Sequence, residues 1–238
     1  MHLNKTRAAI VARRLLALLL ILSAFAAVPA GAQTKAGRYE KDIEAFEAAD
    51  HAQFPPADAA LFLGSSSIRF WTTLAEDFPE IPTIRRGFGG SELSDSVLYA
   101  DRIAIPYKPR IVVVYAGGND LNAGKSVATV VGDFEALAAK IHAALPATTV
   151  IYVSMNPTIA RWSEDDKVRE TNRQIAEFTK SKPGLAYIDT YSGLLGADGK
   201  PQAALLRVDG LHLNRQGYRK WTELMKARVL ELYRGAGR

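Results

Sequence analysis

Short apolar segments alternate with helical segments along most of this chain, and this alternation strongly limits the folds it can adopt. The clearest apolar segment, 111–115, is β-branched except for its final tyrosine, which is typical of a strand buried on both faces. Single helices separate five such segments. This order predicts a parallel sheet with helices on both faces, a three-layer α/β domain. The predicted strands are 59–63, 83–84, 111–115, 149–153 and 185–188.

The connecting segments carry apolar residues at helical spacing. Residues 33–58 are expected to form a helical extension that packs on the domain. The predicted helices are 38–52, 67–76, 92–103, 127–145, 166–179 and about 214–233.

The first 32 residues have the order of a secretory signal peptide: basic residues, an apolar run and then small residues. The apolar run, 15–28, is shorter than the roughly 20 residues that a spanning helix needs. Ala30-Gly31-Ala32 resembles a signal-peptidase site, so we expect cleavage after Ala32 and a periplasmic or secreted protein without a stable membrane anchor.

Charge and cysteine content exclude several function classes. The chain has 30 basic and 25 acidic side chains, but four basic residues and no acidic ones lie in 1–32. The mature chain would therefore be close to neutral, without the clustered basic stripe of a nucleic-acid binder. The absence of cysteine excludes disulfides, cysteine-ligated metals and a cysteine nucleophile.

Small and polar residues follow several of the predicted strands. In parallel α/β sheets the functional site lies beyond the carboxyl ends of the strands, so these loops are candidates for it. The motifs are Gly64-Ser65-Ser66-Ser67, Gly87-Phe88-Gly89-Gly90, Gly117-Gly118-Asn119-Asp120 and, near the end of the chain, Asp209-Gly210-Leu211-His212.

Two of these regions resemble nucleotide-binding motifs but lack a required glycine. A dinucleotide fingerprint beginning at Gly87 would have Glu92 at its third glycine position. A phosphate loop ending in Gly124-Lys125-Ser126 would have Asn119 at its first glycine position. These departures argue against nucleotide binding.

Taken singly, the Gly-rich loops are also compatible with tight turns in a binding module. Serine hydrolysis explains them together, because a serine nucleophile needs a histidine base and a carboxylate that orients it. His51 and His142 lie on predicted helical segments, whereas His212 follows Asp209 by three residues. The Gly-x-Ser-x-Gly elbow of α/β-hydrolases is absent, since residue 68 is Ile.

The four motifs, in this order, resemble those of the SGNH hydrolases, also called GDSL-type esterases and lipases. The resemblance spans residues 59–218, and it makes 59–238 the hydrolase domain. It implies a flavodoxin-like sheet of order 2-1-3-4-5 and a serine hydrolase that needs no cofactor and no metal.

Matched residue by residue, the resemblance implies a catalytic triad of Ser66, His212 and Asp209. It also implies an oxyanion hole formed by Ser66, Gly90 and Asn119. A side chain at Gly90 is expected to crowd the acyl carbonyl.

The chain departs from the family pattern at two positions. Ser65 replaces the aspartate that precedes the nucleophile, and Arg85 stands where relatives often have asparagine. The substrate implied is a small-molecule or glycan ester with a short acyl group, such as O-acetyl on carbohydrate. Loop 156–162 is expected to be either a wall of the substrate pocket or an ordinary connection between a strand and a helix. The alternatives are a lysophospholipase or thioesterase, or an inactive carbohydrate-binding relative.

Overall fold

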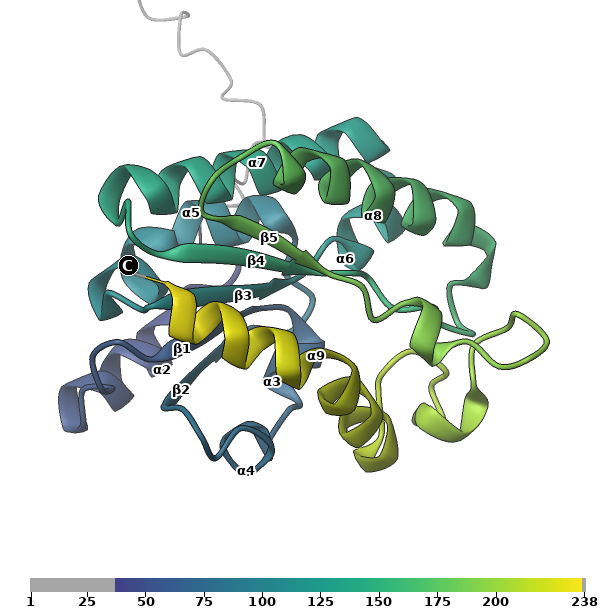
Figure 1. Ribbon diagram of the computed structural model, residues 1–238, viewed down its shortest axis with the longest axis horizontal. Helices are drawn as coiled ribbons and strands as arrows, with labels where there is room; N and C mark the ends of the chain where they lie inside the picture. The colour runs from purple at the N-terminus through teal and green to yellow at the C-terminus, as the bar shows by residue number, and fades with distance from the viewer. Residues whose placement is uncertain (1–36, 237–238) are drawn as a thin grey trace, which may run out of the picture. The chain divides into compact units, whose positions relative to one another are not determined.

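The computed structural model describes residues 37–236, so the predicted signal peptide lies outside the described residues. Its centre is a five-stranded parallel sheet of order β2-β1-β3-β4-β5 (Figure 1), which confirms the predicted architecture and strand order. The strands are β1 (Ala60–Gly64), β2 (Thr83–Gly87), β3 (Ile111–Tyr115), β4 (Thr149–Val153) and β5 (Leu185–Ile188).

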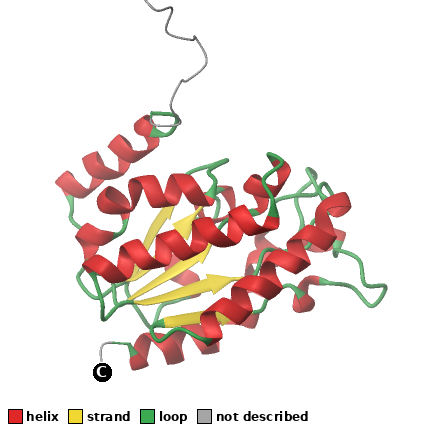
Figure 2. Cartoon of the chain, turned by 90° about the horizontal axis from the view of Figure 1, so that it is seen from above, coloured by secondary structure: helices red, strands yellow, loops and turns green. Residues whose placement is uncertain are grey.

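Helices cover both faces of the sheet, with the strands lying between them (Figure 2). The α-helices are α2 (Glu40–Ala52), α3 (Ser66–Arg69), α4 (Leu74–Asp77), α5 (Leu93–Ile103), α6 (Gly118–Asn122), α7 (Val127–Ala144), α8 (Asp165–Lys180) and α9 (Arg215–Gly235). Short 3-10 turns occur at η1 (Ile105–Tyr107), η2 (Trp162–Glu164), η3 (Ser192–Leu194) and η4 (Ala203–Leu205).

Alternation along the strands divides the core into two layers. Leu61 and Leu63 of β1 pack with residues of α5, α7 and α8 on one face. Phe62, between them, packs with residues of α9 and with the segment around α3 and α4 on the other face. The three central strands β1, β3 and β4 are therefore covered on both sides, as their mostly apolar composition predicts.

Helix α2 is attached to this domain by both apolar and charged contacts. Ile43 is fully buried, and the Arg102 guanidinium of α5 pairs with Glu40 and Glu47, each at 2.6 Å. Buried Arg86 of β2 bonds to Asp50. Within residues 37–236, no helix combines the length and apolar character needed to cross a membrane.

The prediction of a single helix over 67–76 is wrong, because the structure has two short helices, α3 and α4, in this region. The segment between them inserts Trp71 into the core, where its ring lies 4.9 Å from that of Trp221. The Trp71 indole N–H donates to Asp77 at 2.7 Å, and so does the Thr73 hydroxyl at 2.8 Å. Burial of the large ring thus outweighs continuation of the helix.

Candidate active site

Ser66 lies just beyond the carboxyl end of β1, at the first residue of α3. A Cβ atom at Gly64 would lie 2.0 Å from the carbonyl oxygen of Tyr115, so only glycine permits this approach of β1 to the end of β3. As the first residue of a helix, Ser66 has a backbone N–H without an acceptor inside that helix. The end of the strand therefore presents both the hydroxyl and the amide of Ser66 at the edge of the sheet.

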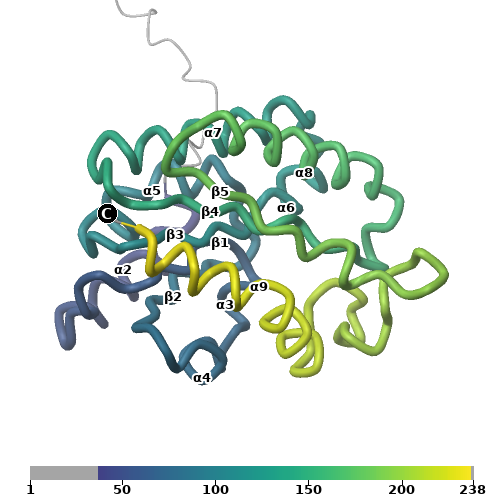
Figure 3. The backbone as a smooth tube through the Cα atoms, in the orientation of Figure 1, coloured from purple at the N-terminus to yellow at the C-terminus, as the bar shows by residue number. Residues whose placement is uncertain are grey.

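His212 and Asp209 come from the turn that precedes α9, which the backbone trace brings close to α3 (Figure 3). The backbone N–H of Arg207 donates to the carbonyl of His212 at 2.7 Å and closes this turn. Asn214 caps α9 by accepting from the Gly217 N–H at 2.9 Å. These hydrogen bonds fix both ends of the turn independently of its contact with Ser66.

Hydrogen bonds connect Asp209, His212 and Ser66 in a continuous path. His212 Nδ1 lies 2.8 Å from Asp209 Oδ2, and His212 Nε2 lies 2.8 Å from Ser66 Oγ. An ionised carboxylate only accepts hydrogen bonds, so in neutral His212 the proton lies on Nδ1. Nε2 is then the acceptor of the Ser66 hydroxyl proton, as a general base requires.

Asp209 is an anion, and its side chain is 44% exposed to solvent. The backbone N–H of His212 donates to Asp209 Oδ1 at 2.9 Å, and the N–H of Leu211 donates to the same oxygen at 2.9 Å. The hydrogen bond from the His212 backbone N–H has the largest effect on the pKa of Asp209. Together with the His212 imidazole and the Leu211 N–H, it outweighs the opposing effect of burial and lowers this pKa to about 2.

The other two histidines in the described part of the chain lie elsewhere. Nε2 of His142, on α7, is 3.0 Å from the carbonyl oxygen of Thr148. His51, on α2, lines a separate surface hollow together with Phe54 and Tyr107. Among residues 37–236, only His212 forms a hydrogen bond to Ser66.

The predicted oxyanion-hole residues lie on two loops that contact each other. Gly90 is in the loop between β2 and α5, and Asn119 is in α6, directly after β3. Asn119 Nδ2 donates to the carbonyl of Ser91 at 2.9 Å, which joins the two loops. A Cβ atom at Gly90 would meet Tyr39 Oη at 3.4 Å, an ordinary contact, and the φ of +82° also disfavours any residue other than glycine there. The expected crowding of the acyl carbonyl stays a prediction.

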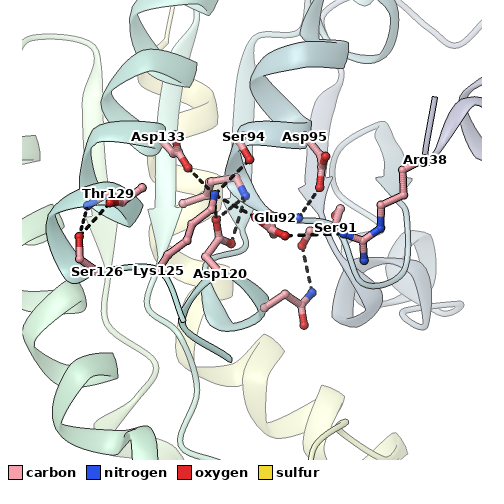
Figure 4. Close-up of polar contacts among 12 residues, drawn as sticks. Arg38, Ser91, Glu92, Ser94, Asp95, Asp120, Lys125, Ser126, Thr129 and Asp133 are labelled. Atoms are coloured by element: carbon pink, nitrogen blue, oxygen red, sulfur yellow. Dashed lines mark hydrogen bonds and ion pairs between the residues drawn. The ribbon is translucent and has the colours of Figure 1, made fainter. Parts of the chain in front are cut away.

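A charged cluster centred on Lys125 holds these two loops together (Figure 4). Its ammonium lies 2.8 Å from fully buried Asp120, 2.7 Å from Asp133 and 3.0 Å from Glu92. Asp120 also accepts the N–H of Leu93 at 3.1 Å. Burial lowers the pKa of Lys125, but hydrogen bonds to the carboxylates outweigh this effect and raise it above its ordinary value. Lys125 is therefore a fixed cation.

A cavity of about 50 Å³ adjoins Ser66. Its wall contains apolar side chains, polar side chains and the two catalytic candidates Ser66 and His212. Loop 156–162 forms part of this wall through Asn156, Thr158 and Arg161, whereas the ring of Trp162 lies 4.9 Å from the Lys200 ammonium. Gly90 does not line this cavity. The lining residues include Ser66, Tyr115, Asn119, Met155, Val168 and His212.

Arg161 is a site residue that the sequence patterns did not identify. It follows a strand by eight residues and belongs to no motif, and arginines are common in surface loops. Only the folded loop brings its guanidinium to Asn119 Oδ1, at 3.2 Å from Nη1 and 3.1 Å from Nη2.

The two residues that depart from the family pattern lie in different environments. Ser65 is buried beside the nucleophile, and Arg85 is exposed on β2.

Solved structures of related fold include a GDSL-like lipase from Bacteroides thetaiotaomicron, with a TM-score of 0.69 and 20% identity over 79% of this chain and 97% of that one. A carbohydrate esterase of family 3 from Talaromyces cellulolyticus gives a TM-score of 0.62 at 20% identity, over 75% and 99% of the chains. A family 3 carbohydrate esterase from Clostridium thermocellum gives 0.60 at 15% identity, over 75% and 99%. These similarities show a shared fold.

No curated protein matches the chain by sequence. The family model described as GDSL-like lipase/acylhydrolase matches residues 59–220, which is well over half of the chain and contains all four motifs. The chain therefore belongs to the GDSL-like lipase/acylhydrolase family of serine ester hydrolases.

Proposed function

We propose that this protein is an exported esterase that cleaves short acyl groups, such as O-acetyl groups on carbohydrate. Ser66 is the nucleophile, His212 the general base and Asp209 the residue that orients the imidazole. The observation that carries this proposal is the path of two 2.8 Å hydrogen bonds from Asp209 through His212 to Ser66, at the edge of a cavity.

In the acylation step, Ser66 Oγ attacks the carbonyl carbon of the ester while its proton passes to His212 Nε2. The carbonyl oxygen becomes an oxyanion, and the ionised Asp209 stabilises the imidazolium that has formed. When the tetrahedral intermediate collapses, the bond from carbon to the alcohol oxygen breaks. His212 then returns its proton to the leaving alcohol, and the acyl group remains on Ser66.

Deacylation repeats these steps with water as the nucleophile. His212 takes a proton from the water, the hydroxyl oxygen attacks the acyl carbon, and Ser66 leaves with the proton that His212 returns. The backbone N–H groups of Ser66 and Gly90 and the Asn119 amide are proposed to donate to the oxyanion in both steps. Removal of one such donor typically lowers kcat by 100-fold or more.

The size of the cavity favours a short acyl group. Its volume of about 50 Å³ is small beside the roughly 300–1,000 Å³ of pockets that bind drug-sized ligands. Tyr115, Met155 and Val168 give this space partly apolar walls. The fold shared with two proteins named as carbohydrate esterases is in keeping with an acetylated sugar as substrate.

Export is proposed from the sequence of the first 32 residues, with removal of the segment that ends at Ala32. Material recovered outside the cytoplasm would begin at Gln33, and N-terminal sequencing tests this. An exported protein that retains residues 1–32 would contradict the proposal.

The substrate proposal is tested with p-nitrophenyl acetate, butyrate and octanoate and with acetylated oligosaccharides, using Ser66→Ala as the inactive control. We expect kcat/KM to fall by about tenfold or more from acetate to octanoate, because each methylene that does not fit costs on the order of 1 kcal/mol or more. A preference for octanoate would favour a lysophospholipase or thioesterase. Binding of the oligosaccharide without hydrolysis of any ester would favour the inactive relative.

A further inference from the structure

The side-chain amide of Asn119 is held on its oxygen side by Arg161. Nη1 and Nη2 of the guanidinium lie 3.2 and 3.1 Å from Asn119 Oδ1, and Nη1 also donates to the carbonyl of Gly118 at 3.0 Å. Arg161 belongs to the loop after β4, whereas Asn119 belongs to α6 after β3. Three hydrogen bonds thus connect the loop after β4 to α6, and Gly118, Asn119 and Arg161 all line the cavity.

This contact determines which way the amide faces. A guanidinium only donates hydrogen bonds, so it selects the rotamer with Oδ1 toward Arg161 and excludes the flipped amide. Nδ2 then faces away and donates one N–H to the carbonyl of Ser91 at 2.9 Å. Its second N–H remains available for an oxyanion on Ser66. We propose that Arg161 is the positioning residue that orients and polarises this donor; the inference rests on the oxyanion role proposed above for Asn119.

The charge of Arg161 adds to this orienting effect. A hydrogen bond from a cation is shorter and stronger than one from a neutral donor. Withdrawing electron density at Oδ1 also makes the N–H groups of the same amide better donors, since linked hydrogen bonds polarise one another. Arg161 would therefore act mainly on kcat, when negative charge develops.

A double-mutant cycle between Asn119 and Arg161 tests the inference on p-nitrophenyl acetate. Asn119→Ala is expected to lower kcat by about 100-fold. Arg161→Met is expected to lower kcat by about tenfold with KM changed less than about twofold, and to have no further effect in the Asn119→Ala background. Arg161→Lys should retain part of the activity, because lysine keeps the charge but loses the two-pronged geometry.

Arg173→Met is the matched control, because Arg173 is exposed on α8 and pairs only with Glu170 among the described residues. It should retain wild-type kcat. Melting temperatures of all variants separate lost chemistry from lost folding, and Arg161→Gln serves in place of Arg161→Met if the methionine variant does not fold.

Two results would overturn the positioning role and leave the triad in place. One is a double variant whose loss of kcat equals the product of the losses in Arg161→Met and Asn119→Ala. The other is a raised KM for Arg161→Met with unchanged kcat. Wild-type kcat in Asn119→Ala would instead remove the oxyanion role on which the inference rests.

Discussion

His212 Nε2 lies 2.8 Å from Ser66 Oγ although 146 residues of sequence separate them. A second contact nearby supports this one: the Tyr218 hydroxyl, in the first turns of α9, donates to the carbonyl of Ser67 at 2.7 Å. The start of α9 is thus attached to α3 independently of the catalytic hydrogen bond. The base and the nucleophile are therefore held together before a substrate arrives, and this pre-organisation underlies the predictions below.

Only one of three adjacent serines should react as a nucleophile. Ser66→Ala is expected to abolish labelling by a fluorophosphonate probe, because only the Ser66 hydroxyl contacts His212 among the described residues. Ser65→Ala and Ser67→Ala are the matched controls and should retain labelling. Loss of the label in Ser65→Ala with retention in Ser66→Ala would place the nucleophile one residue earlier.

Activity should rise with pH on the acid side of its profile, because only a neutral imidazole can accept the Ser66 proton. Asp209 does not contribute to this limb, since its pKa is lowered to about 2 and the carboxylate is ionised throughout. A profile of kcat/KM against pH should show one proton lost on the acid side. Two protons there would mean that a second group controls activity.

The orienting role of Asp209 predicts a different result for two substitutions. Asp209→Asn should lower kcat by up to about 10⁴-fold, because the amide favours the wrong imidazole tautomer. Asp209→Ala should be milder, since it imposes no tautomer. Steady-state kinetics with circular dichroism on each variant measure this. Equal activity of wild type and folded Asp209→Asn would exclude the role.

Gly90→Ala should lower kcat more than a substitution with the same backbone strain elsewhere. Gly90 has a φ of +82° and Gly199 a φ of +71°, and either alanine costs on the order of 1–2 kcal/mol in that region. A Cβ atom at Gly199 meets nothing within 4 Å. We expect urea denaturation to show a similar loss of stability in both variants. Steady-state kinetics should show a loss of kcat only in Gly90→Ala. If both variants keep wild-type kcat, the backbone conformation at residue 90 does not control the oxyanion hole.

Lys125→Met should lower the free energy of unfolding by about 3–5 kcal/mol, because it leaves the fully buried Asp120 without its cation. Lys180→Met is the control: Lys180 is 70% exposed and pairs with Glu177 on the same helix. Such surface pairs contribute little to stability, because water and salt screen the charges. Urea denaturation measures both variants, and equal losses would show that the buried cluster adds no stability.

Several features of this protein follow from local sequence. The apolar run 111–115 indicates a buried strand because its composition suits a strand covered on both faces, and the observed β3 has the same bounds. Asp209 and His212 are three residues apart, so a single turn brings the carboxylate to the imidazole. The order of the strands and the place of Ser66 came from motifs that resemble those of a known family.

Other features depended on contacts between distant residues. Residues 67–76 have a helical pattern, but Trp71 packs against Trp221 and the helix is broken there. Arg161 belongs to no motif, and only the folding of its loop against α6 brings it to Asn119. Periodicity and motifs report what neighbouring residues favour, whereas these contacts join segments far apart in the chain. Their free energy is gained only when the complete domain packs, so only the tertiary structure decided them.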